Sequence, residues 1–192
     1  MTPDPHESES RAARAPRETV FDPFEVLGLS RRFDIDVNAV QRAVLQRLAR
    51  AHPDRQPGAG TDPMVQARAE QESARLNQAK AILCDDEKRA DTLVVLLGGP
   101  SKEDEKSLPD GFLMDMLETR EQMEEALAAD DRAQLDELKD WAEETRSAYI
   151  SQTTELFTAL SDGQEPADTL RQIRIVLNAW RYIERMIEQI DP

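Results

Sequence analysis

Apolar residues recur at intervals of three and four along most of this chain, as at Ile173, Leu177, Trp180 and Ile183. That spacing gathers apolar side chains on one face of a helix, whereas a half-buried strand needs strict alternation. No segment alternates in a sustained way, and no Asn-Gly pair marks a tight hairpin. The pattern predicts an all-α fold.

Four helices are expected in the first half of the chain, and their ends follow from local signals. Aspartate followed by proline is typical of a helix start, because the aspartate accepts free backbone N–H groups and proline lacks one. Such pairs occur at Asp22-Pro23 and Asp62-Pro63, while Gly28 and Gly98-Gly99 are typical of helix ends. The expected helices cover about 24–27, 37–51, 63–83, and from 85 or 86 to the paired glycines.

Three longer helices are expected in the second half, over about 109–128, 131–160 and 166–190. The connections between them are short, which favours antiparallel neighbours in a three-helix bundle. Their apolar stripes are expected to form the core. On the last two helices these stripes comprise Leu135, Leu138, Ala142, Thr145 and Tyr149, then Ile173, Leu177, Trp180 and Ile183.

Charge divides the chain near the paired glycines. Of a net charge of -15, residues 98–192 carry nearly all, with 10 basic and 23 acidic residues. Gly98-Gly99-Pro100 ends a helix, because proline cannot continue the hydrogen-bond ladder. We therefore expect a disordered tail over 1–20, a first domain over 21–97, a linker over 98–107 and a second domain over 108–192.

Composition narrows the classes of function. With one cysteine, Cys84, and two histidines, the chain lacks an internal disulfide and the ligands of a Cys/His zinc site or an iron-sulfur cluster. No cofactor or resident metal is expected. The acidic surface repels nucleic acid and anionic membranes. No apolar run has the length of a signal peptide or a membrane span, so we expect a cytoplasmic protein.

A basic helix with two distinct sides precedes the tripeptide His52-Pro53-Asp54. On a helical wheel, one side holds Val37, Val40, Val44, Leu45 and Leu48, the other holds Arg42, Gln46 and Arg50, and Arg47 lies on the flank. No acidic residue interrupts 37–51, although like charges on one helix repel each other. The alternatives are a solvated face and a simple helix terminator. A docking face for an acidic partner explains the segregation of charge better.

Together these features resemble a J-domain, the module that activates the ATPase of DnaK-class chaperones. The resemblance rests on a short helix ending Phe24-Glu25-Val26-Leu27-Gly28-Leu29, the basic helix, His52-Pro53-Asp54, and a helix ending Leu76-Asn77-Gln78-Ala79-Lys80-Ala81-Ile82-Leu83. In the second half, Phe112-Leu113-Met114-Asp115-Met116-Leu117-Glu118-Thr119-Arg120-Glu121 is similar to a segment of the HscB family. Members of that family are J-type co-chaperones of iron-sulfur cluster assembly with a three-helix C-terminal domain.

The resemblance implies two protein partners. His52 has no partnering Ser, Cys or second nearby His in the sequence, so no enzymatic activity is expected in this chain. The first partner is an HscA- or DnaK-type chaperone, expected to contact Arg42, Arg47, Arg50, His52, Pro53, Asp54 and Arg55. The second is the scaffold protein IscU, expected to contact Leu113, Met114, Leu117, Glu118, Arg120, Glu121 and Ile175. Ile175 falls where some members carry an aromatic residue. The implied function is delivery of IscU to the chaperone with stimulation of the chaperone's ATPase.

The helix over 109–128 carries two stripes of apolar residues, and only one of them can face the core. If Phe112, Met116 and Met123 face inward, then Leu113, Met114 and Leu117 form an exposed apolar patch bordered by charges, which is the usual anatomy of a protein-binding site. In the alternative arrangement Leu113 and Leu117 are core.

Two other functions stay open: a general J-domain co-chaperone with other clients, and a helical adaptor without chaperone activity.

Overall fold

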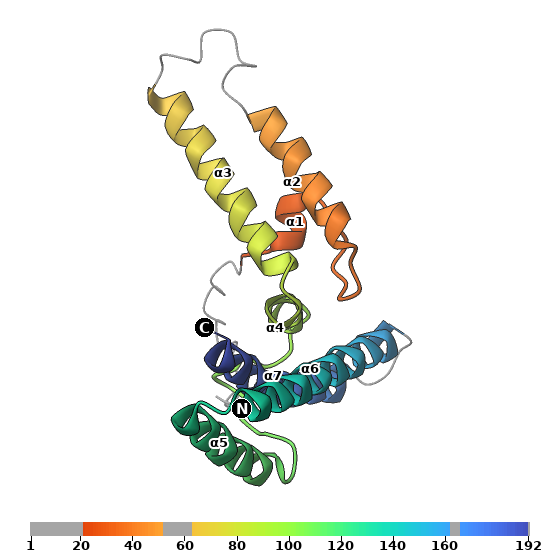
Figure 1. The fold of residues 1–192 in the computed structure, drawn as a ribbon. Coiled ribbons are helices and arrows are strands. Elements are labelled where there is room, and N and C mark those ends of the chain that lie inside the picture. The colour runs from red at the N-terminus through yellow and green to blue at the C-terminus, as the bar shows by residue number, and fades with distance from the viewer. Residues whose placement is uncertain (1–20, 52–62, 162–165, 192) are drawn as a thin grey trace, which may run out of the picture.

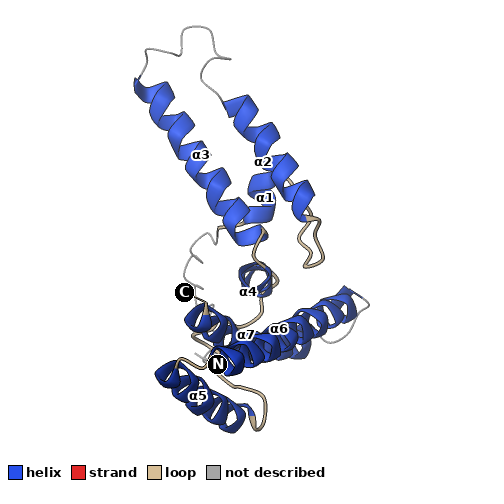
Figure 2. Ribbon diagram, viewed as in Figure 1, coloured by secondary structure: helices blue, strands red, loops and turns tan. Residues whose placement is uncertain are grey.

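The computed structural model describes residues 21–51, 63–161 and 166–191. Within these ranges the chain is helical and contains no strand, which confirms the all-α prediction (Figures 1 and 2). The helices are α1 (Pro23–Leu27), α2 (Val37–Ala51), α3 (Pro63–Leu83), α4 (Asp86–Leu96), α5 (Phe112–Ala129), α6 (Arg132–Ser161) and α7 (Pro166–Ile190). None of the described helices is both long enough and apolar enough to cross a membrane.

The local signals act as expected at the ends of α1. The Asp22 carboxylate accepts hydrogen bonds from the backbone N–H groups of Phe24, at 2.9 Å, and Glu25, at 3.1 Å. Gly28 closes the helix in the left-handed region at φ 67°, where glycine has no Cβ to clash. Similarly, Asp85 caps α4 by accepting from the Lys88 N–H.

The start of α5 differs from the sequence expectation, which placed it at about residue 109. The helix begins at Phe112, because Gly111 adopts a left-handed conformation at φ 80° and the Phe112 N–H donates to the Pro109 carbonyl in a turn. No side chain caps this end. Proline is therefore used here in the turn before the helix and not in its first turn.

Helices α2 and α3 form a projecting hairpin, and helices α5, α6 and α7 form a three-helix base. Helices α2 and α3 run side by side as the hairpin, with α1 between them at its lower end (Figure 1). Helix α4 lies beneath the hairpin and packs on α7, α6 pairs with α7 along its length, and α5 lies against α6 on the side away from the hairpin.

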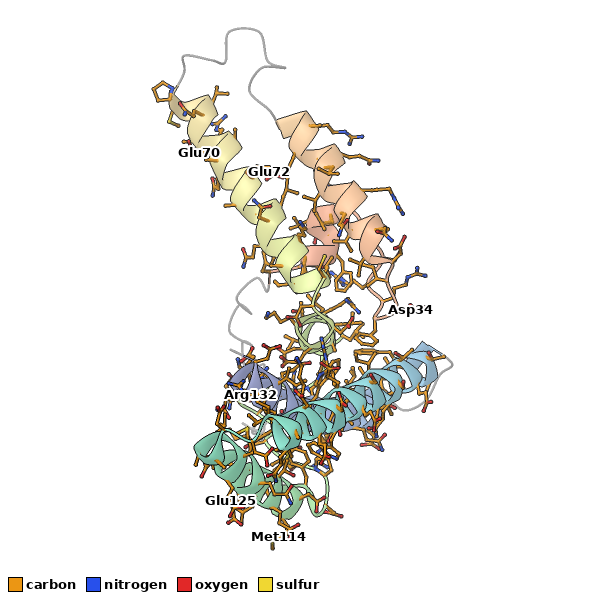
Figure 3. All side chains as sticks on the ribbon, in the orientation of Figure 1. Asp34, Glu70, Glu72, Met114, Glu125 and Arg132 are labelled. Atoms are coloured by element: carbon orange, nitrogen blue, oxygen red, sulfur yellow. The ribbon has the colours of Figure 1, made fainter. Side chains whose placement is uncertain are left out.

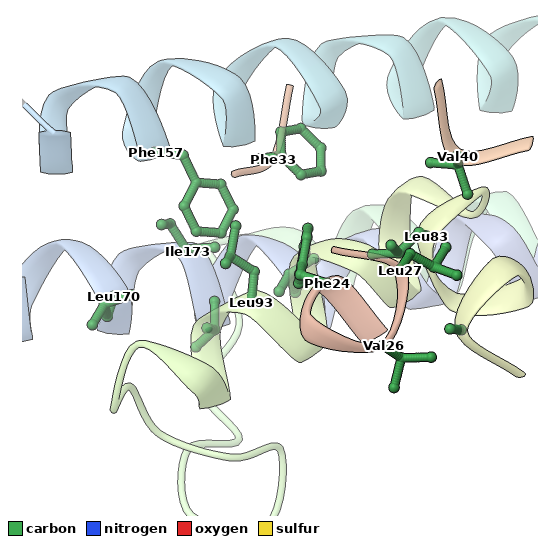
Figure 4. Close-up of a cluster of buried hydrophobic side chains, with 14 of the residues drawn as sticks. Phe24, Val26, Leu27, Phe33, Val40, Leu83, Leu93, Phe157, Leu170 and Ile173 are labelled. Atoms are coloured by element: carbon green, nitrogen blue, oxygen red, sulfur yellow. The ribbon is translucent and has the colours of Figure 1, made fainter. Parts of the chain in front are cut away.

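One hydrophobic core joins the first and second halves of the chain. Phe33, from the loop before α2, stacks on Phe157 of α6 with ring centroids 5.4 Å apart, and Leu93 of α4 lies beside them (Figure 4). Trp180 of α7 belongs to the same cluster and is fully buried. A second cluster holds α5, α6 and α7 together and comprises Met123, Ala126, Leu135, Leu138, Ala142, Ile183 and Met186. The residues proposed as core in the last two helices are buried, except for the partly buried Thr145 and Tyr149.

The segment over 98–107 is held against α7 by polar contacts. The Asn178 side chain donates to the carbonyls of Glu105 and Ser107, both at 3.0 Å, and Arg171 Nε lies 2.6 Å from Glu105 Oε2. Hydrogen bonding from Ser107, followed by pairing with Arg171, lowers the pKa of Glu105 from 4.5 to about 2. Arg174 donates to the Pro100 carbonyl and pairs with Asp91 of α4. This segment therefore follows a defined path between the halves.

Candidate protein-docking sites

The exposed side of α2 carries two arginines that were expected to meet a partner. Arg42 and Arg50 are both exposed, and Arg42 pairs with Asp36 at 3.1 Å. A hydrogen bond from the Asn38 backbone, together with Arg42, lowers the pKa of Asp36 below its ordinary value. Because the Arg42–Asp36 pair is exposed to solvent, it holds Arg42 weakly and leaves it able to exchange partners.

Arg47 packs against the end of α1. A Cβ placed on Gly28 would lie 2.5 Å from one of its guanidinium nitrogens, so the guanidinium covers this glycine. Its side chain is partly buried, unlike those of Arg42 and Arg50. Arg47 therefore joins α1 to α2, and its guanidinium is less free to meet a partner.

The apolar side of α2 is narrower than the helical wheel indicated. Val40 and Val44 are buried and Leu48 packs on them, but Leu45 is 67% exposed and Val37 is 38% exposed. Leu45 and Val37 therefore lie outside the buried part of this side. Helix α2 packs mainly on α3 and α1, so a stripe one residue wide on each turn suffices to fill the contact. Leu45 instead adds an apolar side chain to the face that carries Arg42.

The tripeptide His52-Pro53-Asp54 and Arg55 lie outside the described residues. In sequence they follow directly on α2, whose last turn carries Arg50. The assignment of these four residues to a chaperone contact stays a prediction.

Helix α5 carries three large apolar side chains that face solvent. Leu113, Met114 and Leu117, which we call the α5 patch, are 62%, 64% and 54% exposed. Phe112 and Met123 are buried on the opposite side of the helix and Met116 is partly buried. Of the two arrangements open at the sequence level, the exposed patch is present and the one with Leu113 and Leu117 in the core is wrong.

Charged residues border the α5 patch. Glu118, Arg120 and Glu121 are exposed, and Arg120 Nε lies 2.8 Å from Glu124 Oε1 one turn further on. An apolar centre with a charged rim is the arrangement found in many protein interfaces. The structure brings all six predicted α5 residues onto one exposed side of the helix.

Ile175 belongs to a different helix. It lies partly buried on α7, two turns before Tyr182. Tyr182 is 42% exposed and meets the ring of Phe112 edge-on, with centroids 5.6 Å apart. Sequence reasoning missed this tyrosine, although its seven-residue spacing from Ile175 places both on one face of a helix. Tyr182 connects the face of α7 that carries Ile175 to the start of α5.

The α2 surface and the α5 patch lie at opposite ends of the molecule. Figure 3 labels Glu70 and Glu72 on the hairpin and Met114 at the far edge of α5, with α6 and α7 between them. The two surfaces therefore do not form a common cleft. Among the described residues, no three His, Cys, Asp or Glu side chains are grouped to hold a metal ion. The two candidate docking surfaces are therefore separate.

Comparison with known proteins relates both halves to one group. A family model described as the HSCB C-terminal oligomerisation domain matches residues 108–191. The chain is 31% identical to the co-chaperone protein HscB homolog of Ralstonia nicotianae over 169 residues, covering 88% of this chain and 95% of the relative. It is 33% identical to the homolog of Paraburkholderia phymatum over 173 residues, with the same coverage.

Solved structures show the same fold. The crystal structure of human co-chaperone protein HscB superimposes with a TM-score of 0.73 at 20% identity, covering 98% of this chain and 92% of that one. Chaperone HscB from Vibrio cholerae superimposes with a TM-score of 0.60 at 27% identity, covering 88% and 98%. The likeness extends across the hairpin and the three-helix base, and is not confined to one of them.

Proposed function

The chain belongs to the HscB family of co-chaperones, and from this membership we propose that it delivers an IscU-type scaffold protein to an HscA- or DnaK-type chaperone and stimulates that chaperone's ATPase. Co-chaperones of this family are not enzymes, so the hydrolytic chemistry belongs to the partner. The proposed process is the assembly and transfer of iron-sulfur clusters in the cytoplasm. The cluster is cargo of the scaffold and not a group held by this chain.

The observation that supports scaffold binding is the exposure of the α5 patch. Leu113, Met114 and Leu117 each keep more than half of their surface in water, whereas Phe112 and Met123 of the same helix are buried. Exposing adjacent large apolar side chains costs free energy that burial in a complex would recover, at about 25 cal/mol for each Å². The patch therefore fits the scaffold contact that the family resemblance implies for these residues.

The charged rim supports the same assignment. Glu118, Arg120 and Glu121 surround the patch with both signs of charge. Such a rim orients a partner and rejects wrong ones more than it adds affinity. We propose that Ile175 adds to this client surface from α7, since Tyr182 of the same helix contacts Phe112 at the start of α5.

The chaperone contact is proposed for the exposed side of α2 and the following tripeptide. Arg42 and Arg50 would attract an acidic surface on the chaperone, and the exposed Leu45, one turn from Arg42, would supply an apolar contact. His52 and Asp54 would add directional hydrogen bonds, with Pro53 restricting the backbone that joins them. Separation of the two surfaces lets the chain hold both partners at once.

The decisive experiment truncates the α5 patch. A Leu113→Ala, Met114→Ala, Leu117→Ala variant should bind the scaffold more than tenfold more weakly in isothermal titration calorimetry. Stimulation of the chaperone's ATPase, measured without scaffold, should persist. Its Tm should stay close to wild type, because truncating exposed side chains costs little whereas buried leucines cost about 2–5 kcal/mol each.

Leu127→Ala is the matched control for this variant. Leu127 is another leucine of α5, 47% exposed but one to two turns beyond the patch and its rim. Its truncation should leave scaffold affinity within about twofold of wild type. A folded triple variant with unaltered scaffold affinity would contradict the scaffold assignment and favour a general J-domain co-chaperone with other clients.

A further inference from the structure

A groove runs between α5 and α6 beside the α5 patch. Its volume is about 460 Å³, within the size range of ordinary binding pockets. Four residues on each helix line it, at spacings of three and four that place them on one face. The lining includes Asp115, Glu118 and Thr119 of α5 and Glu137, Leu138 and Trp141 of α6. The lining residues extend along about two turns of each helix.

The groove is acidic without internal compensation. Asp115, Glu118 and Glu137 bring three carboxylates to its lining, and no basic residue lines it. Over the described ranges, none of the three forms an ion pair. Basic residues elsewhere on α5 and α6 pair outside the groove: Arg120 with Glu124, Arg132 with Asp130, Lys139 with Asp191 and Arg146 with Glu184. The negative charge of the groove is therefore available to a partner.

Trp141 gives the groove an aromatic wall. It is 38% exposed, whereas Trp180 is fully buried and its indole N–H donates to Glu184 at 2.7 Å. No described residue accepts a hydrogen bond from the Trp141 indole. Leu138, which is 8% exposed and belongs to the second core cluster, lies beneath. An indole face beside carboxylates and an apolar floor suits a guanidinium or ammonium group on a long aliphatic stem.

We propose that the α5–α6 groove receives an arginine or lysine side chain of the protein that binds the α5 patch. This inference rests on the proposed function, since it takes the scaffold as that protein. Continuity supports it: Glu118 belongs both to the rim of the patch and to the groove, and Asp115 follows Met114 directly. The partner therefore carries a basic residue next to the apolar segment that covers the α5 patch. Trp141 and Glu137 of α6 hold that basic side chain.

The test measures scaffold affinity for groove variants in the full chain by isothermal titration calorimetry. Trp141→Ala should weaken binding about tenfold, as expected for an aromatic contact at an interface. Glu137→Gln should weaken it about threefold, and Glu137→Arg more. The effect of charge reversal should shrink at high salt, because exposed charges are screened within about 8 Å already at physiological ionic strength.

Glu155→Gln is the control for Glu137→Gln. Glu155 is an exposed glutamate of the same helix, 18 residues further on and therefore about 27 Å away along the axis. Its substitution should leave scaffold affinity within about twofold of wild type. Because part of the Trp141 ring packs on the bundle, Trp141→Ala would test stability as well as binding, and the Glu137 variants keep the test valid if Trp141→Ala lowers the Tm. Melting curves of every variant accompany the titrations.

The possible outcomes separate this inference from the proposed function. If wild type and groove variants bind the scaffold equally while truncation of the α5 patch weakens binding, the groove inference alone is overturned. If wild type does not bind the scaffold, the proposed function fails and the inference fails with it. If Glu137→Arg instead abolishes self-association in analytical ultracentrifugation without changing scaffold affinity, the groove holds a second copy of this chain and the inference is overturned.

Discussion

Single charged residues hold the two halves of this chain in place from inside the fold. Arg89 is 4% exposed, donates to the carbonyls of Phe33 and Leu83, and lies 4.9 Å from the Phe33 ring centroid. Arg174 is 1% exposed and ties α7 to α4 and to Pro100. Burying a charge is costly unless it is paired and hydrogen-bonded, so these contacts favour the present positions of the surrounding segments. Arg174 Nη2 has no hydrogen-bond partner among the described residues, so the pairing of that arginine is incomplete.

Glu105 should make the stability of the fold depend on acid. Since its folded pKa of about 2 lies below the ordinary 4.5, its stabilising contribution is present above about pH 4.5 and is lost as the pH falls towards 2. Glu105→Gln should therefore lower the Tm at neutral pH, and its difference from wild type should narrow in acid. Thermal melts from pH 7 to pH 3 measure this, with the exposed Glu103→Gln as control. A Tm difference that is constant with pH would contradict the assignment.

At the scale of the element, helices α2 and α5 both expose large apolar side chains but differ in the charges around them. Each leaves apolar side chains in water on the side away from its neighbours, Leu45 on α2 and the patch on α5. On α2 the apolar residue shares its face with Arg42, whereas on α5 the rim is predominantly acidic. Two surfaces of opposite charge character favour different partners and reduce competition for one site.

Charge reversal on α2 should slow association with the chaperone. Arg42→Glu and Arg50→Glu together should lower the association rate by about tenfold at low salt, measured by stopped flow, with a smaller effect at high salt. Arg75→Glu, which reverses an exposed arginine of α3, is the control and should change the rate little. His52→Gln is the comparator and should abolish ATPase stimulation at every salt concentration. Association rates indifferent to salt and to both reversals would leave α2 as solvated surface only.

At the scale of the whole molecule, the hairpin and the base share one core. Phe33, Phe24 and Leu83 from the first half pack in the same cluster as Phe157, Ile173 and Trp180 from the second. The pairs Arg174–Asp91 and Arg181–Glu87 add polar links between α7 and α4. Because packed interiors resist local change, the two candidate docking surfaces are held in a defined relation to each other.

Removing one ring from the shared core should therefore destabilise both halves. Phe157→Ala should cost about 3–5 kcal/mol of unfolding free energy, measured by denaturant titration. Hydrogen exchange should then accelerate in α1 and α3 as well as in α6. Met123→Ala, in the second cluster, should accelerate exchange mainly in α5 and α6. Unchanged protection of α1 and α3 in the Phe157 variant would show that the hairpin is stable without the base.

Much of the fold follows from the sequence because helix ends are decided by neighbours in the chain. Asp22, Gly28 and Asp85 act through hydrogen bonds and backbone conformations that span two to four residues, so their effect can be predicted without knowing the fold. The candidate site residues on α5 could also be predicted in part, since helical spacing limits the apolar residues of this helix to two stripes. Spacing alone could not choose between those stripes.

The choice between faces was made by tertiary structure. Leu113 and Leu45 are as apolar as their buried neighbours. They are exposed because the neighbouring helices pack on one side of α5 and one side of α2. The shared core and the α5–α6 groove depend likewise on which residues far apart in the chain are brought together, as Phe33 meets Phe157. Helical periodicity orders side chains around one axis, but burial is decided by what packs against that axis. The sequence by itself therefore determined where the helices begin and end along the chain and which helix faces are apolar, and packing between distant helices decided which of those faces are buried and which stay exposed.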